Sequence, residues 1–184
     1  VSYHLTLPKD IQHLAFLGFE KGEHRYQYPT PSATQCSDIL RLCSGLADIL
    51  LVDIPTSFSR DMLSTIAILK AGVSLRLETL DIKNVSYLSS SLPLLQSHPQ
   101  YKSKRELRAL NDVHHTPKAV LKKKKEYDTL LPYCAELSQH SRHGTILQGL
   151  TARESDGYKR SIKALTQTII RKVDAYEKTD AQFL

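Results

Sequence analysis

Two short stretches of the chain alternate polar and apolar residues with a period of two, which is typical of a half-buried strand. The first is SYHLTL at residues 2–7, which ends at Pro8. The second is VSLRLE at residues 73–78, which follows Gly72. We therefore predict two short strands, one near the beginning of the sequence and one before its middle.

Elsewhere the apolar residues recur at the three- and four-residue steps of a helix. We predict a short helix over 9–19 and a longer one over 34–51. A third helix is expected to run from a cap at Thr56 or Ser57 to Ala71. Further helices are predicted over 80–97, 103–113 and 117–140, the last interrupted at Pro132. The pattern indicates a mainly α protein with a short β-ribbon, additional helices and a long C-terminal helix.

The C-terminal helix has the clearest pattern. Thr151 and Glu154 have the spacing of a capping box. After them an apolar stripe recurs at steps of three and four residues: Tyr158, Ile162, Leu165, Ile169, Val173 and Tyr176. Such a stripe either pairs with the same helix of a second subunit or packs on its own chain.

We divide the chain into an N-terminal strand with helices (1–72), a central ribbon and basic segment (73–126) and a helical C-terminal region with a dimerisation role (127–184).

Composition is that of an ordinary globular protein, with 41% hydrophobic and 24% charged residues. No apolar run approaches the ~20 residues that span a bilayer, and the first residues do not resemble a secretory signal. The three cysteines, Cys36, Cys43 and Cys134, form a sparse, odd set that is typical of a reducing compartment. We therefore expect a cytoplasmic protein with no membrane partner.

The formal net charge of +6 is localised in one stretch of the chain. Between Tyr101 and Glu126 the only acids are Glu106, Asp112 and Glu126, so this stretch alone has the excess of the whole chain. Its basic residues are Lys102, Lys104, Arg105, Arg108, Lys118, Lys122, Lys123, Lys124 and Lys125. Cations that neutralise phosphates release condensed counterions, so a localised excess favours a nucleic-acid partner. A solvated surface that only keeps the protein soluble is the alternative.

The first predicted strand, in SYHLTLPKD at residues 2–10, resembles the start of ribbon-helix-helix transcription regulators. In that family the strand pairs with its copy in a second subunit, and the two-stranded ribbon enters the major groove of DNA. The resemblance implies that Ser2, His4 and Thr6 touch base edges, while the alternate apolar residues are buried.

The second predicted strand is similar to the same ribbon, and KSKREL at residues 102–107 looks like the start of the family's second helix. On this alternative Ser74 and Arg76 read bases, and Ser103 caps a helix whose N-terminus holds a DNA phosphate. The two ribbon candidates compete, and the second has its helix within the basic stretch.

Residues 46–80, with a strand–helix–strand order, are similar to part of the catalytic domain of serine recombinases, and Ser59 and Arg60 correspond to the start of the family's Ser-Arg helix. That family cuts DNA with a serine on a loop after the first strand. Residues 14–22 contain no serine, so the resemblance implies a relative that cannot form the phosphoseryl intermediate.

The sequence contains few candidate residues for metal binding or catalysis. Cys134, His140 and His143 could supply soft metal ligands, but the paired spacing of structural zinc sites is missing. Phosphate-loop, dinucleotide and serine-hydrolase motifs are absent from the sequence. We therefore expect no enzyme, no cofactor, no metal and no small-molecule ligand.

Together these observations predict a sequence-specific transcription regulator that binds double-stranded DNA as a homodimer, in the setting of a plasmid or another mobile element. Two alternatives remain open. One is a helical interaction or scaffold protein that binds RNA or acidic partners. The other is a catalytically inactive, recombinase-like DNA-binding protein.

Overall fold

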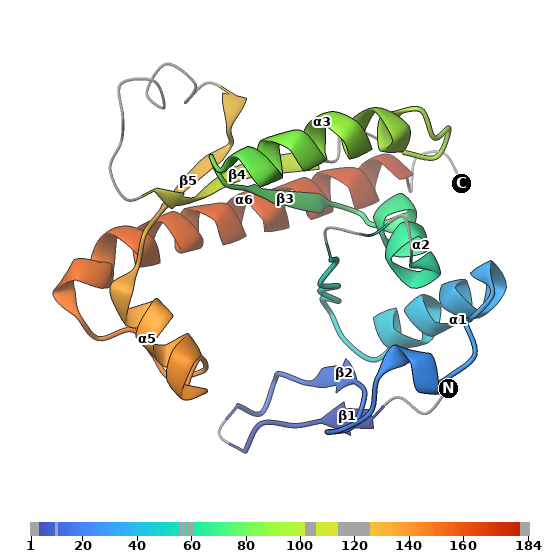
Figure 1. Ribbon diagram of the computed structural model, residues 1–184, viewed down its shortest axis with the longest axis horizontal. Helices are drawn as coiled ribbons and strands as arrows, with labels where there is room; N and C mark the ends of the chain where they lie inside the picture. Colours follow the sequence, from blue (N-terminus) through green and yellow to red (C-terminus); the bar gives the residue numbers. More distant parts are fainter. Residues whose placement is uncertain are drawn as a thin grey trace. The chain divides into compact units, whose positions relative to one another are not determined.

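The computed structural model describes residues 4–9, 11–55, 58, 61–101, 106–113 and 126–180 (Figure 1). The chain forms two compact units, Val1–Ala67 and Ile68–Leu184. The boundary between them falls within helix α2 (Met62–Lys70). Helices account for much of both units, and each unit has one small sheet, so the fold is mixed rather than purely α.

The first unit begins with an antiparallel hairpin of β1 (His4–Thr6) and β2 (Phe16–Gly18), in which Leu5 lies opposite Leu17. The predicted first strand is confirmed in part of its length. The helix predicted over 9–19 is wrong, because Phe16–Gly18 is a strand and the other described residues of that stretch form turns or have no regular structure. A helix of this length is only marginally stable by itself in water, so a local helical pattern over 9–19 does not decide the structure.

A 3-10 turn, η1 (Arg25–Gln27), leads to helix α1 (Ala33–Ser44). Its N-terminus is a capping box formed by Ser32 and Gln35. The helix ends at Ser44, where the N–H of Gly45 returns to the carbonyl of Arg41. The prediction of a helix to residue 51 was therefore too long, since residues 47–55 are described and are not helical.

Helix α2 is capped by Asp61, whose carboxylate accepts a 2.8 Å hydrogen bond from the backbone N–H of Ser64. The caps that we predicted, Thr56 and Ser57, lie outside the described residues. The end of this helix at Lys70, just before Gly72, agrees with the prediction.

The second unit is built on a parallel sheet with the order β3 (Ser74–Glu78), β4 (Glu106–Val113), β5 (Thr129–Pro132). Helix α3 (Ile82–Gln96) connects β3 to β4, as parallel neighbours require. Asp81 caps this helix by accepting a 2.9 Å hydrogen bond from the N–H of Asn84. The strand predicted over 73–78 and the helix predicted over 80–97 are both confirmed within a few residues.

The helix predicted over 103–113 is wrong, because Glu106–Val113 is the central strand of this sheet. The helix predicted over 117–140 is wrong at Thr129–Pro132, which is β5, and right at α5 (Ala135–His143). Leu107 and Leu110 are three residues apart, which suggested a helix, but they are fully buried in a strand that is paired on both sides. A strand covered on both faces does not need to alternate, so its pattern is ambiguous.

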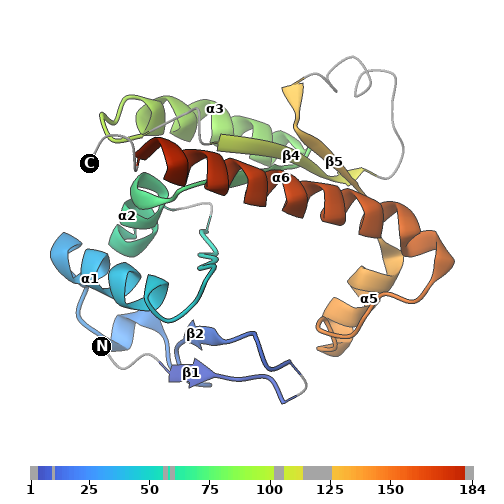
Figure 2. The same ribbon diagram turned by 180° about the vertical axis from the view of Figure 1, so that it is seen from behind.

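The long C-terminal helix is confirmed as α6 (Asp156–Asp180), which directly follows the 3-10 turn η5 (Arg153–Ser155). Its apolar stripe packs on the sheet of its own chain, where Leu165 joins Ala109 and Leu131 in a buried cluster. Tyr158, Ile162 and Ile169 of the stripe lie against the same cluster. The opposite views in Figures 1 and 2 show α3 on one face of the sheet and α6 on the other.

The capping box predicted for Thr151 and Glu154 is wrong. The turn η5 begins after Ala152, which makes no side-chain cap, and the hydroxyl of Thr151 donates to Glu136 instead. Among the described helices, none combines the length and the apolar character needed to cross a membrane.

Candidate nucleic-acid interface

The strands of the parallel sheet begin at one edge, which we call the amino edge: it is defined by Ser74, Glu106 and Thr129, the first residues of β3, β4 and β5. In the register of β4 and β5, Ala109 lies opposite Thr129, which is an offset of 20 residues along the chain. The same offset separates the two basic runs of the sequence. We name them the first basic run (Lys102, Lys104 and Arg105) and the lysine run (Lys122, Lys123, Lys124 and Lys125).

Both runs lie outside the described residues, but each is covalently joined to a described residue at the amino edge. Arg105 precedes Glu106, the first residue of β4, and Lys125 precedes Glu126, which leads into β5. The pairing of β4 with the segment that leads into β5 already includes Asp128, whose N–H donates a 2.9 Å hydrogen bond to the carbonyl of Arg108. The described residues that directly follow the two runs, Glu106 and Glu126, therefore lead into neighbouring strands from the same side of the sheet.

A network of charged side chains crosses β3 and β4 on one face of the sheet. Glu78 accepts hydrogen bonds from Nε of Arg76 at 2.8 Å and from Nε of Arg108 at 2.9 Å. Arg108 binds in bidentate fashion, because its Nη2 donates to the second oxygen of Glu78 at 3.1 Å. Arg76 also contacts Glu106 through Nη2 at 2.9 Å, and the hydroxyl of Tyr101 donates to the same carboxylate.

The ionisation of this network follows from its contacts. Burial alone would raise the pKa of Glu78, but the hydrogen bond from Arg108 and the charge of Arg76 outweigh it and lower that pKa. The hydrogen bond that Arg108 donates to Glu78 raises the pKa of Arg108 in turn. Burial and then Glu106 raise the pKa of Tyr101. Arg108 is therefore charged, and the carboxylate of Glu78 neutralises it.

Arg76 and Arg108, which the sequence suggested as DNA contacts, are thus engaged within the sheet, and the side chain of Arg76 is only 18% exposed. Ser74 lies at the amino edge, half-buried. The segment that we interpreted as the start of a second helix, residues 102–107, is a strand from Glu106 onward. That interpretation is wrong for the described residues of the segment. The other predicted DNA contacts lie outside the described residues: Ser2, Ser103, Lys118 and both basic runs.

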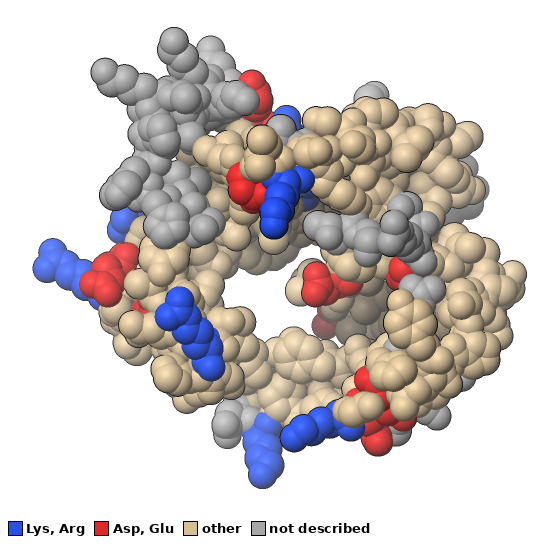
Figure 3. All heavy atoms as spheres, viewed as in Figure 1, with Lys and Arg blue, Asp and Glu red and all other residues tan. Residues whose placement is uncertain are grey.

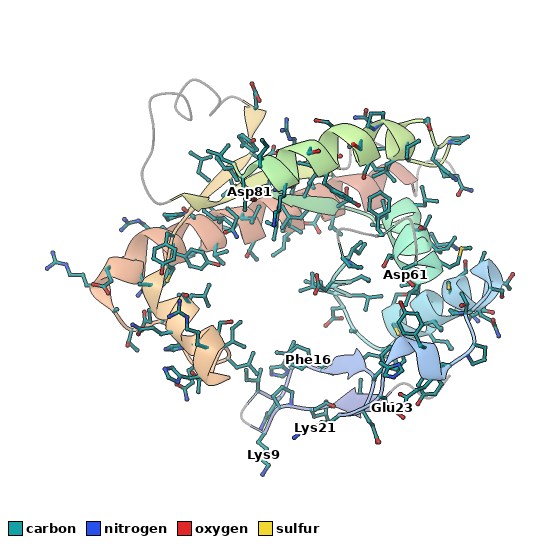
Figure 4. All side chains as sticks on the ribbon, viewed as in Figure 1. Lys9, Phe16, Lys21, Glu23, Asp61 and Asp81 are labelled. Carbon is teal, nitrogen blue, oxygen red and sulfur yellow. The ribbon has the colours of Figure 1, made fainter. Side chains whose placement is uncertain are left out.

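The first ribbon candidate lies in the hairpin of the first unit. His4 and Thr6 are residues of β1, and Thr6 is exposed. The hairpin pairs β1 with β2 of the same chain. Figure 4 shows Lys9, in the connection between β1 and β2, and Lys21, which follows β2. In this two-stranded sheet β1 pairs with β2 along one edge, and its other edge pairs with no described strand.

One cation at the amino edge was missed by sequence reasoning. Lys172, on α6, donates a 2.9 Å hydrogen bond from Nζ to the backbone carbonyl of Glu106. In the sequence this residue is one of several charges beside the apolar stripe, and only the packing of α6 on the sheet brings it to β4. The signal was its position one residue before Val173 of the stripe, which puts its stem beside the core.

The described part of the chain has little excess charge of its own. It contains 16 of the 25 basic residues and 18 of the 19 acidic ones, so the remaining nine basic residues and Asp10 lie outside it. On the face seen in Figure 3, the described Lys and Arg side chains are spread singly or in pairs among Asp and Glu. Of these nine basic residues, seven form the two basic runs, and the other two are Arg60 and Lys118.

The soft ligands noted in the sequence do not converge. Cys134 precedes α5, and its thiol donates to the hydroxyl of Ser155 at 3.4 Å, while His140 and His143 lie in α5 itself. Across the residues that can be described, no three His, Cys, Asp or Glu side chains form a group that could hold a metal ion.

Comparison with known proteins adds no family to these observations. No family model, no curated protein and no solved structure matches this chain.

Proposed function

We propose that the protein binds double-stranded DNA through the two basic runs at the amino edge of the parallel sheet. The observation that supports this most is the 20-residue register between β4 and β5, since it equals the spacing between the runs. Seven basic residues that are dispersed along 24 residues of sequence are thereby joined to neighbouring strands. Clustered cations on one side of a protein are the electrostatic mark of a nucleic-acid contact.

Phosphate contacts would provide affinity, and its dependence on salt is calculable. If all seven cations neutralise a phosphate, the slope of log K against log salt is about −6. Lysine–phosphate contacts carry no sequence information, so sequence preference requires other residues. The ribbon candidate in β1 is our proposal for that role, in a transcription regulator that acts as a dimer in a reducing compartment of the cell.

The resemblance to serine recombinases also suggests DNA as the partner. Helix α2 followed by strand β3 matches the helix–strand order that this resemblance implies for residues 61–78. Residues 47–55, which would be the preceding strand, are described without regular structure. A catalytically inactive, recombinase-like DNA-binding protein is therefore the second candidate, and it shares the first experiment.

The experiment measures binding of a fluorescent 30-base-pair duplex at several salt concentrations by anisotropy. One variant changes the four residues of the lysine run to Gln. The matched control changes four exposed cations elsewhere, namely Lys83, Arg142, Arg160 and Lys163. We expect the lysine-run variant to lose about tenfold or more in affinity and about 3 to 4 units of salt slope, and the control to lose much less. Equal losses in the two variants would contradict the proposal.

The same assay separates the alternatives by partner. A regulator should prefer one duplex sequence to random duplex by ~10³ or more. Equal binding of all duplexes leaves a DNA-binding protein without sequence readout. Stronger competition by RNA than by duplex DNA would favour the helical interaction protein. Sedimentation of the free protein and of the complex tests the expected dimer.

A further inference from the structure

We propose that β3 is a subunit interface, at which its open edge pairs antiparallel with β3 of a second copy of this chain. This inference rests on the proposed function, because it names the contact that holds the expected dimer together. The pairing joins two three-stranded sheets into one continuous sheet of six strands. Helices lie on both faces of the sheet, so the paired strands form an interface and not a ribbon that enters a DNA groove (Figures 1 and 2).

The outer edge of β3 is open and unprotected. The strand pairs with β4 on its inner side and with no described strand on its outer side, where its backbone groups can bind another strand. Open edges are commonly protected by a proline or by a free charged side chain. The other outer strand, β5, ends in Pro132 and has no exposed large apolar residue. In β3 the cation is Arg76, which Glu78 and Glu106 already bind.

Two leucines of β3 continue the apolar face of the sheet beyond the helix that covers it. In the register with β4, Leu75 lies opposite Leu107 and Leu77 lies opposite Ala109. Ala109 belongs to the cluster under α6, so these four residues face the same side. Leu107 and Ala109 are fully buried, whereas Leu75 is 37% and Leu77 is 54% exposed. A further strand beside β3 extends the sheet and covers the two leucines.

The charges of β3 favour a second copy of β3 as this strand. When two copies pair antiparallel about Leu77, this residue lies opposite itself, and Arg76 lies opposite Glu78 of the second copy. Unlike charges directly opposite each other stabilise a strand pair, and the two-fold symmetry makes the contact twice. A pairing about Arg76 would instead place two arginines opposite each other. The register about Leu77 therefore combines an apolar centre with complementary charges on either side of it.

The test measures the dimer dissociation constant of the full chain by sedimentation, with Leu77→Lys and Leu77→Glu as variants. Each change places two like charges opposite each other, so we expect the dissociation constant of either variant to rise about 30-fold or more. The matched control is Leu94→Lys, at a leucine of α3 that is 71% exposed, and it should change the constant by less than about threefold. A monomeric wild type, or Leu77 variants that dimerise as the control does, would overturn the inference.

A mixture of the two variants tests the register. The new lysine of one variant meets the new glutamate of the other only if residue 77 faces its own copy. We therefore expect equal amounts of Leu77→Lys and Leu77→Glu to form a mixed dimer at concentrations at which each alone is monomeric. A mixture that stays monomeric at those concentrations would also overturn the inference.

If a charged residue at 77 prevents folding, Leu77→Cys tests the same pairing. Directly opposite Cα atoms of antiparallel strands are about 4.5 to 5.5 Å apart, which a disulfide can span. Oxidation should cross-link Leu77→Cys into a covalent dimer at least about tenfold faster than Leu75→Cys, whose position faces residue 79 of the second copy. The wild type, with its three native cysteines, provides the background rate. Equal rates for the two variants would contradict the register about Leu77.

The failure of the proposed function gives a different result. In that case the lysine-run variant binds duplex as well as its matched control does, while Leu77→Lys still dissociates the dimer. The inference fails alone when the lysine run matters for duplex binding and both charged Leu77 variants remain dimeric.

Discussion

The hydroxyl of Ser155 donates a 2.6 Å hydrogen bond to the carboxylate of Glu136, which lies in the first turn of helix α5. The same carboxylate accepts from the N–H of Thr151 at 2.7 Å and from the N–H of Ala152 at 3.1 Å. One side chain thereby holds the segment that leads into α6, and it does so where the sequence suggested a local capping box. The hydrogen bond from Ser155, followed by that from the Thr151 backbone, lowers the pKa of Glu136 to about 2.

A pH dependence of stability follows from that lowered pKa. A carboxyl whose pKa is lower in the folded than in the unfolded protein stabilises the fold above its ordinary pKa, and this contribution is lost as the pH falls. We expect Glu136→Gln to lower the unfolding free energy at pH 7 and to approach the wild type between about pH 4.5 and pH 2. Urea unfolding followed by circular dichroism measures both. Glu154→Gln, an exposed neighbour, is the control, and a loss that does not depend on pH would contradict the assignment.

Removal of Glu78 should destabilise the second unit strongly. Its side chain is 7% exposed and neutralises two arginines, so Glu78→Gln leaves Arg76 and Arg108 under-compensated. We expect a loss of about 3 kcal/mol in unfolding free energy, as for other buried pairs that lose one partner. The matched control is Asp38→Asn, which breaks the exposed pair with Arg41 and should cost less than about 1 kcal/mol. Equal effects would show that burial does not matter here.

Arg76 should be more important for stability than for sequence preference. Its guanidinium is bound by two carboxylates, so it has few free donors for a base edge. We expect Arg76→Ala to lower the urea midpoint and to leave the ranking of different duplexes unchanged. Thr6→Ala provides the comparison, because Thr6 is exposed in the other ribbon candidate. A changed ranking with Arg76→Ala would instead favour β3 as the strand that reads bases.

The apolar stripe of α6 should contribute to stability through its contact with the sheet. Leu165 is 4% exposed in the cluster with Ala109 and Leu131. Leu165→Ala should cost about 2 to 4 kcal/mol, because it removes buried methyl groups and leaves a cavity. Ile170→Ala, on the same helix but 44% exposed, should cost clearly less. Denaturant unfolding of the two variants tests the burial directly.

The comparison of Leu165→Ala with Ile170→Ala also tests whether the stripe of α6 forms the interface of the expected dimer. The stripe could have formed a seam with a second subunit, but in this chain its middle residues cover the sheet. If Leu165→Ala changed the sedimentation behaviour while leaving the unfolding free energy unchanged, the stripe would belong to a subunit interface instead.

The parts of the fold that the sequence predicted are those in which one local pattern suffices. Strand β3 alternates polar and apolar residues, and α6 has an apolar stripe at the spacing of a helix. The sequence predicts a helix at β4, because its apolar residues Leu107, Ala109 and Leu110 do not keep a period of two. In the structure all three are buried. Nothing in those residues alone indicates that strands lie on both sides of them.

The candidate site divides in the same way. The sequence by itself determined that the excess of positive charge lies between residues 102 and 125, since charge depends only on residue identity. Only the tertiary structure decided that β4 and β5 pair with an offset of 20 residues, and that Glu78 neutralises Arg76 and Arg108. Strand register and ion pairing are contacts between residues distant in the chain, and they depend on which surfaces become buried together rather than on any local pattern.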